Sequence, residues 1–259
     1  MEPFIPIHAE SRQTSFESVK AELVRQSVDV VVNYLPVGAN EASAGYARAA
    51  LEAGCAFVNC TPAPVANHDE MAAAYARAEL PLLGDDIKSQ IGSTAVHQVL
   101  IKLIKERGLK LTKTYQLNIG GNSDFRNMRQ PERGASKKIT KERGLTAFTD
   151  AETVVNVGPS DYVPQLNDFK VAYLHLEGVG LLGVPFSMDM QLRVEDSPNS
   201  TGVVLNAIRS AQHARDRKIG GVVHPVCPAF FKLPPRQVKE DFAALQAFLG
   251  ATDRGTADV

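Results

Sequence analysis

The stretch "VDVVVNYLPVGANEASAGYARAALEAGCAFVNCTP", residues 28–62, decides the fold. It opens with a nearly continuous valine run over 28–36, which is typical of a strand buried on both faces. The turn "PVGAN" then leads into an alanine-rich helix over 41–54, and a short apolar strand follows at 56–60. Strand and helix alternate here with short links, which predicts a doubly wound parallel sheet.

The same pattern extends on both sides of this stretch. Residues 15–26 form an amphipathic helical pattern, residues 69–78 another, and "LPLLGDD" (80–86) reads as a third strand. Parallel sheets of this kind bind ligands at the carboxyl ends of their strands. We therefore expect ligand-binding loops at "YLPVGAN" (34–40), "NCTPAP" (59–64) and "GDDIKSQ" (84–90).

The pattern changes after residue 90. "IGSTAVHQVLIKLIKERG" (91–108) predicts a long amphipathic helix that starts near Ser93 or Thr94 and ends at Gly108. "KLTKTYQLNIGG", "FKVAYLHLEG" and "FSMDMQLRVED" alternate apolar and polar residues, as half-buried strands of a more antiparallel sheet do. Residues 197–218 return to helix, with Pro198 near the first turn. The predicted class is α/β: an incomplete Rossmann-like doubly wound parallel sheet with an inserted mixed α+β domain.

Composition narrows the classes of partner. The 259 residues carry 28 Lys and Arg against 29 Asp and Glu, so a net charge of −1 gives no global field for nucleic acid or an acidic membrane. No apolar run is long enough to cross a bilayer. Three cysteines, Cys55, Cys60 and Cys227, cannot pair completely and show no metal-ligand spacing. Without a signal-like N-terminus, this composition predicts a reducing, cytoplasmic compartment.

Four polar clusters are candidates for chemistry: "GDDIKSQ", "GGNSDFRN", "SKKITK" and "VEDSPNS". Taken singly, each has a simpler explanation as a turn, an Asx-type loop, a solvated helix face or a helix N-cap. Lys170 and Lys232 interrupt apolar surroundings in "LNDFKVAY" and "AFFKLPP". Each is either a stem that covers apolar surface or a partly desolvated amine with a lowered pKa.

Five segments together go further than any cluster alone. In order and spacing, "LPLLGDDIKSQIGSTAVHQVL", "YQLNIGGNSDFRNM", "SKKITK", "VGPSDYVPQLNDFKVAYLHLEG" and "EDSPNSTGVVLNAIR" resemble the myo-inositol-1-phosphate synthases (inositol-3-phosphate synthases), particularly the shorter bacterial and archaeal type. Residues 28–62 look like the second half of that family's dinucleotide-binding domain. The resemblance runs from about residue 27 to about residue 237, and several long motifs in order are far more specific than a lone glycine pattern.

The resemblance implies an isomerase that converts D-glucose 6-phosphate to 1D-myo-inositol 3-phosphate, in inositol and phospholipid biosynthesis, with NAD as a regenerated oxidant. In that chemistry C5 of the sugar is oxidised to a ketone, the resulting C6 enolate attacks the C1 aldehyde, and the ketone is reduced again. Negative charge develops on oxygen at C5 and then at C1, beside a phosphate dianion. Ammonium groups in a dry pocket stabilise such oxyanions and can exchange the protons.

The resemblance also assigns residues. The family motif "SKxIxK" matches Ser136, Lys137, Ile139 and Lys141. The implied catalytic residues are Lys137 at the C5 oxygen, Lys141 at the phosphate, Lys170 at the phosphate and enolate, Lys232 at the C5 hydroxyl proton, Asp124, and Asp196, which orients a lysine or the cofactor. Substrate binding falls to Ser89, Asn122, Asp124 and Lys141. Cofactor binding falls to Val37, Gly38, Asn59, Thr61, Asp86 and Asp196.

The same resemblance predicts an organisation. Residues 1–90 correspond to a partial NAD-binding Rossmann-like domain, 91–200 to a catalytic and tetramerisation domain, and 201–259 to helices that return to the first. A homotetramer built partly through the inserted sheet is implied. Some relatives of the short type are associated with metals, so a divalent or monovalent cation is a further candidate ligand of Asp85, Asp86 or Asp196, although no ligand spacing selects an ion.

One part of the family pattern does not occur. The family's cofactor domain opens with a strand, a glycine-rich turn and a helix that holds the pyrophosphate, whereas no "GAxG" or "GxG" spacing precedes residue 28. We therefore expect an exposed apolar strand edge at 28–34 and weak NAD binding. Either an internal start at Met1 or a real truncation accounts for this.

Two other functions remain open from the sequence. A non-catalytic sugar-phosphate-binding homologue, or an assembly partner of a longer chain, would keep the phosphate-binding residues. A lysine Schiff-base enzyme such as an aldolase would also use amines with sugar phosphates.

Overall fold

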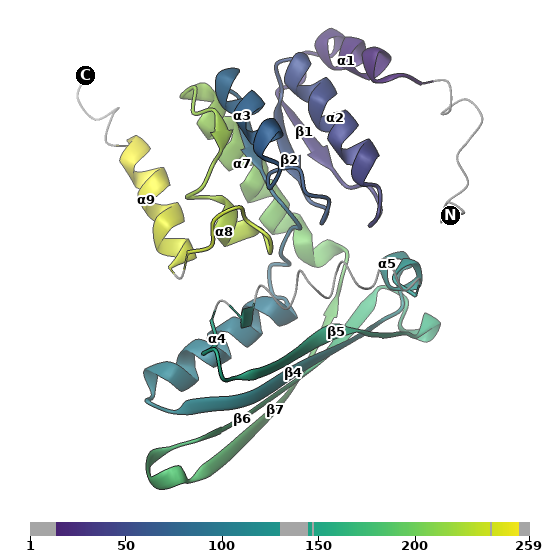
Figure 1. The fold of residues 1–259 in the computed structure, drawn as a ribbon. Helices are drawn as coiled ribbons and strands as arrows, with labels where there is room; N and C mark the ends of the chain where they lie inside the picture. The colour runs from purple at the N-terminus through teal and green to yellow at the C-terminus, as the bar shows by residue number, and fades with distance from the viewer. Residues whose placement is uncertain (1–13, 130–144, 147, 239, 254–259) are drawn as a thin grey trace. The chain divides into compact units, whose positions relative to one another are not determined.

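The computed structural model describes residues 14–129, 145–146, 148–238 and 240–253 (Figure 1). These residues form two compact units. The first unit comprises Met1–Ile87 and Val204–Val259, and the second comprises Lys88–Val203. The chain passes from one unit to the other at residues 87–88 and 203–204. The domains assigned to 1–90, 91–200 and 201–259 remain predictions.

The first unit contains a parallel sheet. Its strands are β1 (Val30–Asn33), β2 (Ala56–Asn59), β3 (Pro81–Leu83) and β8 (Gly221–Val222), in the order β1-β2-β3-β8. The helices are α1 (Phe16–Arg25), α2 (Asn40–Glu52), α3 (Asp69–Arg77), α8 (Cys227–Phe230) and α9 (Asp241–Asp253), with α7 (Thr201–Asp216) entering from the second unit. The predicted alternation of strand and helix is confirmed.

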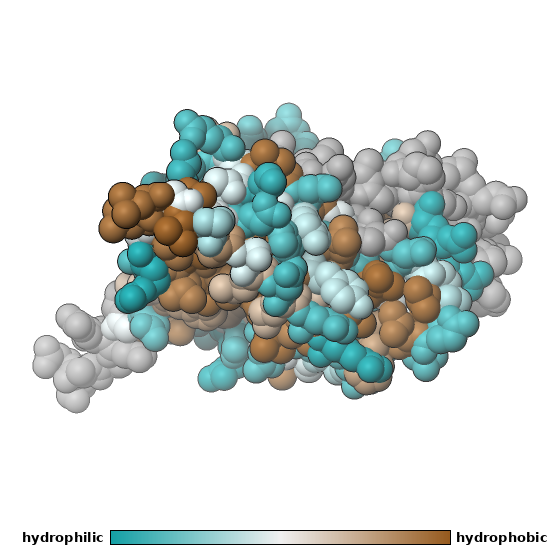
Figure 2. All heavy atoms as spheres, turned by 90° about the horizontal axis from the view of Figure 1, so that it is seen from below, coloured by the Kyte–Doolittle hydropathy of each residue, from teal (hydrophilic) through white to brown (hydrophobic). Residues whose placement is uncertain are grey.

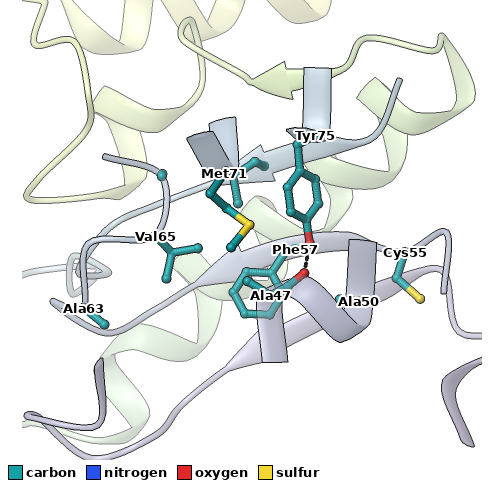
Figure 3. Close-up of a cluster of buried hydrophobic side chains, with 10 residues drawn as sticks. Ala47, Ala50, Cys55, Phe57, Ala63, Val65, Met71 and Tyr75 are labelled. Carbon is teal, nitrogen blue, oxygen red and sulfur yellow. Dashed lines mark hydrogen bonds between the residues drawn. The ribbon is translucent and has the colours of Figure 1, made fainter. Parts of the chain in front are cut away.

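Burial explains why this segment folds as a sheet with helices packed against it. All four residues of β2 are buried, and Phe57 packs among small side chains such as Ala47 and Ala50 of α2 (Figure 3). The Tyr75 hydroxyl lies in the same core and donates a 2.7 Å hydrogen bond to the Ala47 carbonyl oxygen, so its polar atom is satisfied. Alanine on the inner face of α2 lets the helix approach the sheet closely.

β1 is the last strand of this sheet in the described part of the chain. Its three valines are only partly buried, whereas β2 beside it is wholly buried. The predicted edge strand is therefore present, although it is shorter than the predicted 28–36.

The second unit contains a mixed sheet in the order β5-β4-β6-β7. Its strands are β4 (Lys110–Gly120), β5 (Val154–Tyr162), β6 (Phe169–Val179) and β7 (Pro185–Glu195), and its helices are α4 (Ser93–Glu106) and α5 (Ser123–Asn127), with short 3₁₀ turns η2 (Pro164–Leu166), η3 (Leu181–Gly183) and η4 (Pro198–Ser200). The pairs β4–β6 and β6–β7 are antiparallel, as predicted, and β4–β5 is parallel. β5 was not predicted, because Gly158 and Pro159 interrupt its pattern; proline is tolerated in an edge strand such as this one.

α4 covers one face of this sheet. Ile101 and Ile104 pack with Leu111, Val157 and Leu176 in a buried cluster. The opposite face stays open to solvent at several large side chains: Tyr115 (38% exposed), Leu117 (40%), Phe169 (39%) and Tyr173 (42%). Figure 2, a view from below, shows hydrophobic and hydrophilic side chains interleaved on the side that it presents.

A row of polar side chains lies beneath α4. His97 is fully buried, 2.6 Å from the Thr114 hydroxyl and 3.2 Å from the Gln116 amide oxygen, and burial lowers its pKa to about 4. Gln116 in turn donates to Ser93 and to Asn118. Hydrogen bonding of every member is what allows such a polar row to be buried.

Within the described ranges, no helix combines the length and the apolar character needed to span a membrane.

Candidate active site

In the first unit, polar side chains meet where neighbouring parallel strands end. Asn33 ends β1 and donates a 2.8 Å hydrogen bond to the Asn59 amide oxygen at the end of β2. The Thr61 hydroxyl donates to the same oxygen over 3.1 Å, and the Asn59 amide donates to Asp85 Oδ1 over 2.7 Å. All four residues are buried. The carboxyl ends of β1, β2 and β3 are thus joined by one hydrogen-bond network, in the position where such sheets bind ligands.

Asp85 is the centre of that network. Its carboxylate is fully buried and accepts four hydrogen bonds, from the Asn59 side chain, the Ala66 backbone N–H, and both the backbone and the side chain of Asn67. Burial raises the pKa of Asp85 to about 6, while the four N–H donors act in the opposite direction. Its backbone also exchanges two 3.0 Å hydrogen bonds with Leu233, which the Asn67 side chain contacts as well.

Asp86 and Lys232 form an ion pair beside this centre. Lys232 Nζ donates to Asp86 Oδ1 over 2.9 Å, and the Lys232 backbone N–H donates to the Asp86 carbonyl oxygen over 2.7 Å. Asp86 has a φ of 60°, in the left-handed region that costs a non-glycine residue about 1–2 kcal/mol. Its second carboxylate oxygen, Oδ2, is buried and accepts no hydrogen bond from the described residues. A buried oxygen without a donor is costly, and at a functional site it is a position for a ligand O–H or N–H.

In the second unit, a separate cluster forms where β4, β6 and β7 lead into loops. Lys170 contacts Asp196 Oδ1 in an ion pair whose side chains are only 14% and 17% exposed. Asn122 donates from its amide to Asp196 Oδ2 over 3.2 Å and to Asp168 Oδ1 over 3.1 Å. The Asn122 oxygen accepts the first N–H groups of α5, from Asp124 and Phe125, as an N-cap.

The loop after Ser89 is held by Asn199. The Asn199 amide donates to the Ile91 carbonyl oxygen over 2.6 Å, and its oxygen accepts the Ile91 N–H over 3.2 Å. The Gln90 N–H donates to the Asn199 carbonyl oxygen over 2.7 Å. Ser89 is partly buried, and Gly92 approaches it so closely that a Cβ there would lie 3.1 Å from the Ser89 Cβ.

The structure therefore brings together several predicted site residues within each unit. It joins Lys232 to Asp86, with Asn59 and Thr61 nearby, and it joins Lys170 to Asp196 and Asn122. Val37 and Gly38 belong to the turn between β1 and α2, where Gly38 has a φ of 98°. The motif residues Ser136, Lys137, Ile139 and Lys141 lie outside the described residues, so their predicted roles stay predictions.

Sequence reasoning missed four members of these networks: Asn33, Asn67, Asp168 and Ser197. Asp168 had one available signal, because it lies two residues before Lys170 and residues two apart in an extended segment share a side. Ser197 also had a signal, because it directly follows Asp196 in the candidate cluster "VEDSPNS". Asn33 and Asn67 are joined to the site by tertiary contacts. Among the described residues, no three or more His, Cys, Asp or Glu side chains are grouped so as to hold a metal ion.

Comparisons with known proteins identify the family to which this chain belongs. The family described as myo-inositol-1-phosphate synthase matches residues 92–197. The inositol-3-phosphate synthase of Corynebacterium glutamicum is 45% identical over 237 residues, covering 88% of this chain and 65% of that protein. The chain belongs to the myo-inositol-1-phosphate synthase family. The synthase of Mycobacterium tuberculosis is 47% identical over 227 residues, or 86% of this chain and 62% of that protein.

A solved structure is similar to this chain in both sequence and fold. The crystal structure of Ari2 superposes with a TM-score of 0.74 at 40% identity, covering 92% of this chain and 68% of that one. The family match at 92–197 includes the Lys170–Asp196 pair and all four strands of the mixed sheet. The chain spans 65% and 62% of the lengths of the two inositol-3-phosphate synthases. The predicted fold class, Rossmann-like α/β with a second mixed sheet, is confirmed.

Proposed function

We propose that this chain carries the catalytic residues of an inositol-3-phosphate synthase, which converts D-glucose 6-phosphate to 1D-myo-inositol 3-phosphate. The observation that carries the proposal is that two of the four predicted catalytic lysines, Lys170 and Lys232, are partly buried and each is held by a predicted site aspartate. Surface lysines in this chain pair differently: the Lys105–Asp150 pair, for example, is 37% and 58% exposed. Partly buried amines held in one orientation suit the stabilisation of oxyanions.

Lys232 and Asp86 are proposed to handle the proton of the sugar hydroxyl that is oxidised. The Asp86 Oδ1 contact fixes the position of the Lys232 nitrogen. In the proposed step Lys232 acts as the neutral amine: it takes the proton of the sugar hydroxyl, becomes the ammonium paired with Asp86, and returns the proton when the ketone is reduced. Asp86 Oδ2 has hydrogen-bonding capacity that the described residues do not use. A ligand hydroxyl or amide N–H would satisfy this oxygen, and the strained backbone of Asp86 is consistent with a site kept for function.

Lys170 and Asp196 are proposed to neutralise the substrate phosphate and the developing enolate. Asp196 holds the Lys170 ammonium, while Asn122 holds Asp196. The amide of Asn122 already makes hydrogen bonds at both of its polar atoms. We therefore propose that Asn122 orients Asp196 and α5 in the predicted phosphate loop, rather than contacting the substrate directly.

The residues of the first unit fit the nicotinamide end of NAD. The parallel strand order and the buried polar ends of β1, β2 and β3 are the usual surroundings of a dinucleotide, and Asp86 Oδ2 offers an acceptor for a carboxamide N–H. Asn59, Thr61 and Asp86 would hold this end, with Val37 and Gly38 in the adjoining turn. When bound, NAD accepts a hydride from the sugar carbon and returns it later.

A homotetramer is proposed as the working assembly. It is supported by the open face of the mixed sheet, where Tyr115, Leu117 and Tyr173 are all about 40% exposed. Tyr173→Glu should lower the molar mass measured by light scattering, because a charge on a covered sheet face is strongly unfavourable. Tyr34→Glu in the first unit, at a residue 59% exposed, is the matched control. An unchanged mass for the Tyr173 variant would refute the use of this face.

The reducing cytoplasm is the proposed compartment. Its support is that Cys55, Cys60 and Cys227 are all free and buried.

The direct test is product formation from glucose 6-phosphate and NAD, followed by mass spectrometry and ³¹P NMR. Lys170→Ala and Lys232→Ala should each lower kcat by about 10²–10⁴-fold, the usual contribution of an acid–base or charge-stabilising group. Lys105→Ala, which removes only a surface ion pair, should leave kcat unchanged. Undiminished turnover in either of the first two variants would refute the assignment of that lysine.

Two further results would overturn the proposal as a whole. A parent chain that binds the sugar phosphate but forms no inositol phosphate would favour a non-catalytic homologue. Borohydride trapping of a sugar on Lys170 or Lys232 would favour a Schiff-base enzyme, because the proposed reaction forms no imine.

A further inference from the structure

Asp168 is a carboxylate without an assigned role in the second unit. It precedes β6 by one residue, is partly buried, and lies two residues before Lys170. Its carboxylate accepts three hydrogen bonds: from the Ser197 hydroxyl (2.7 Å), the Ser197 backbone N–H (3.1 Å) and the Asn122 amide (3.1 Å). Its carbonyl oxygen also accepts the Asp196 N–H over 2.8 Å. Asp168 therefore contacts Asn122 and the 196–197 segment, both of which adjoin the Lys170–Asp196 pair.

The shared amide of Asn122 links the two aspartates. The amide nitrogen has two protons, and it donates to Asp168 Oδ1 and Asp196 Oδ2. The Asn122 oxygen is occupied by two N–H groups of α5. Asn122 is thus held from both of its ends, and the carboxylate of Asp196 is held through it.

The register of the sheet explains why these residues meet. β6 and β7 are antiparallel, with Phe169 opposite Glu195 and Lys170 opposite Val194. The next step of this ladder brings residue 168 beside residue 196, so the Asp168 and Asp196 backbones pair just beyond the strands. Loop residue Asn122 then closes the network from the end of β4. The Asn122 and Ser197 side chains both donate to the Asp168 carboxylate, so Asp168 joins the segment at residue 122 to the segment at 196–197.

We propose that Asp168 is a positioning residue for Lys170: it orients Asn122 and the 196–197 segment so that Asp196 holds the lysine ammonium in one place. This inference rests on the proposed function, because it concerns the lysine assigned to the phosphate and enolate. A long lysine side chain has many rotamers, so a single carboxylate would leave its nitrogen poorly defined. A network in which every acceptor is oriented by a further donor removes that freedom.

The test is Asp168→Asn in the full chain. Both Asp168 oxygens act as acceptors, so an asparagine in either orientation places an N–H₂ group against one of their donors. The first readout is the ¹⁵N NMR signal of the Lys170 ammonium in lysine-labelled protein, assigned through its absence in Lys170→Arg. We expect this signal to be protected from exchange in the parent chain and to be lost or shifted in Asp168→Asn. Asp150→Asn, which removes a surface charge in the same unit, should leave it unchanged.

The second readout is turnover. Misplacement of a catalytic group by about 1 Å can reduce the rate about 10²-fold, so kcat should fall between about ten-fold and a hundred-fold. KM should rise as well, because Lys170 is also assigned to the substrate phosphate. An unchanged Lys170 signal would overturn the inference, and so would an altered signal with unchanged kcat in an active chain. If the parent chain forms no product, the proposed function fails, but the Lys170 signal still decides whether Asp168 positions the lysine.

A second variant covers the case in which Asp168→Asn does not fold. Ser197→Ala removes the 2.7 Å hydroxyl hydrogen bond and leaves the Asp168 carboxylate and the backbone ladder in place. A smaller shift of the Lys170 signal in the same direction is expected. No shift would overturn the inference.

Discussion

Asp85→Asn should change how the stability of the fold depends on pH. The Asp85 carboxylate is fully buried, and burial raises its pKa from 3.8 to about 6. The folded chain therefore holds a proton between these two values that the unfolded chain has released. It follows that Asp85 makes the fold more stable in acid: this contribution is complete below pH 3.8 and is lost as the pH rises through about 6.

The magnitude follows from the two values. One pKa unit corresponds to 1.36 kcal/mol, so a shift of about two units amounts to about 3 kcal/mol between pH 7 and pH 3.8. Asparagine does not titrate. The parent chain should therefore gain about 3 kcal/mol relative to Asp85→Asn over that range, whatever fixed cost the substitution has from facing an N–H₂ group towards Asn59 or Asn67.

The assay is urea unfolding followed by circular dichroism, in half-unit steps from pH 4 to pH 7.5, on both chains. Asp150→Asn, at an exposed surface pair, is the control and should track the parent chain. Parallel pH curves for the parent and Asp85→Asn would refute the reasoning. They would mean that the four N–H donors offset the effect of burial, so that the Asp85 pKa stays near its ordinary value.

Three other outcomes are expected. His97→Gln should remove an opposite pH dependence: burial lowers the His97 pKa from 6.5 to about 4, so its contribution is present above pH 6.5 and about 3 kcal/mol is lost as the pH falls to 4, as urea unfolding should show. The three buried cysteines, with thiol pKa values raised by burial, should resist Ellman's reagent in the native chain at pH 8 and react fully in guanidinium. Gly121→Ala should destabilise the second unit by about 1–3 kcal/mol in calorimetry, because its Cβ would meet backbone atoms at 2.6–2.7 Å, whereas Gly158→Ala, with open space around it, should not.

The parallel sheet could be predicted because its signals are local. A valine run, a turn and an alanine-rich helix repeat within residues 28–62, and each of these features acts over a few neighbouring residues. β5 could not be predicted in the same way. Its strand contains Gly158 and Pro159, and it exists because β4 offers it a parallel partner along the edge of the sheet. That partner is more than thirty residues away in sequence, so no local pattern reports it.

The site residues also fall into those that the sequence could predict and those that only the structure shows. The family resemblance predicted Lys170, Lys232, Asp86 and Asp196 as site residues, because they lie in recognisable motifs. The structure places these four residues in two pairs. The resemblance did not name Asp168, whose importance lies in what it accepts from Asn122 and Ser197. Motif spacing records which residue types recur, whereas hydrogen-bond partners depend on the register of strands and the ends of helices.

The two lysine–aspartate pairs share one arrangement of side chains. In each, a lysine contacts one aspartate, and a further aspartate lies close behind: Asp85 directly precedes Asp86, and Asp168 shares an asparagine amide with Asp196. The carboxylates of Asp85 and Asp168 accept hydrogen bonds from N–H and O–H donors of the fold. The carboxylates of Asp86 and Asp196 contact the lysine amines. Two carboxylates for each ammonium leave every pair with a net negative charge among these side chains. Asp85 and Asp168 can therefore act in two ways, by orienting their neighbours and by adding negative charge. An Asp→Asn substitution changes both, because it removes the charge and replaces one acceptor oxygen by an N–H₂ donor.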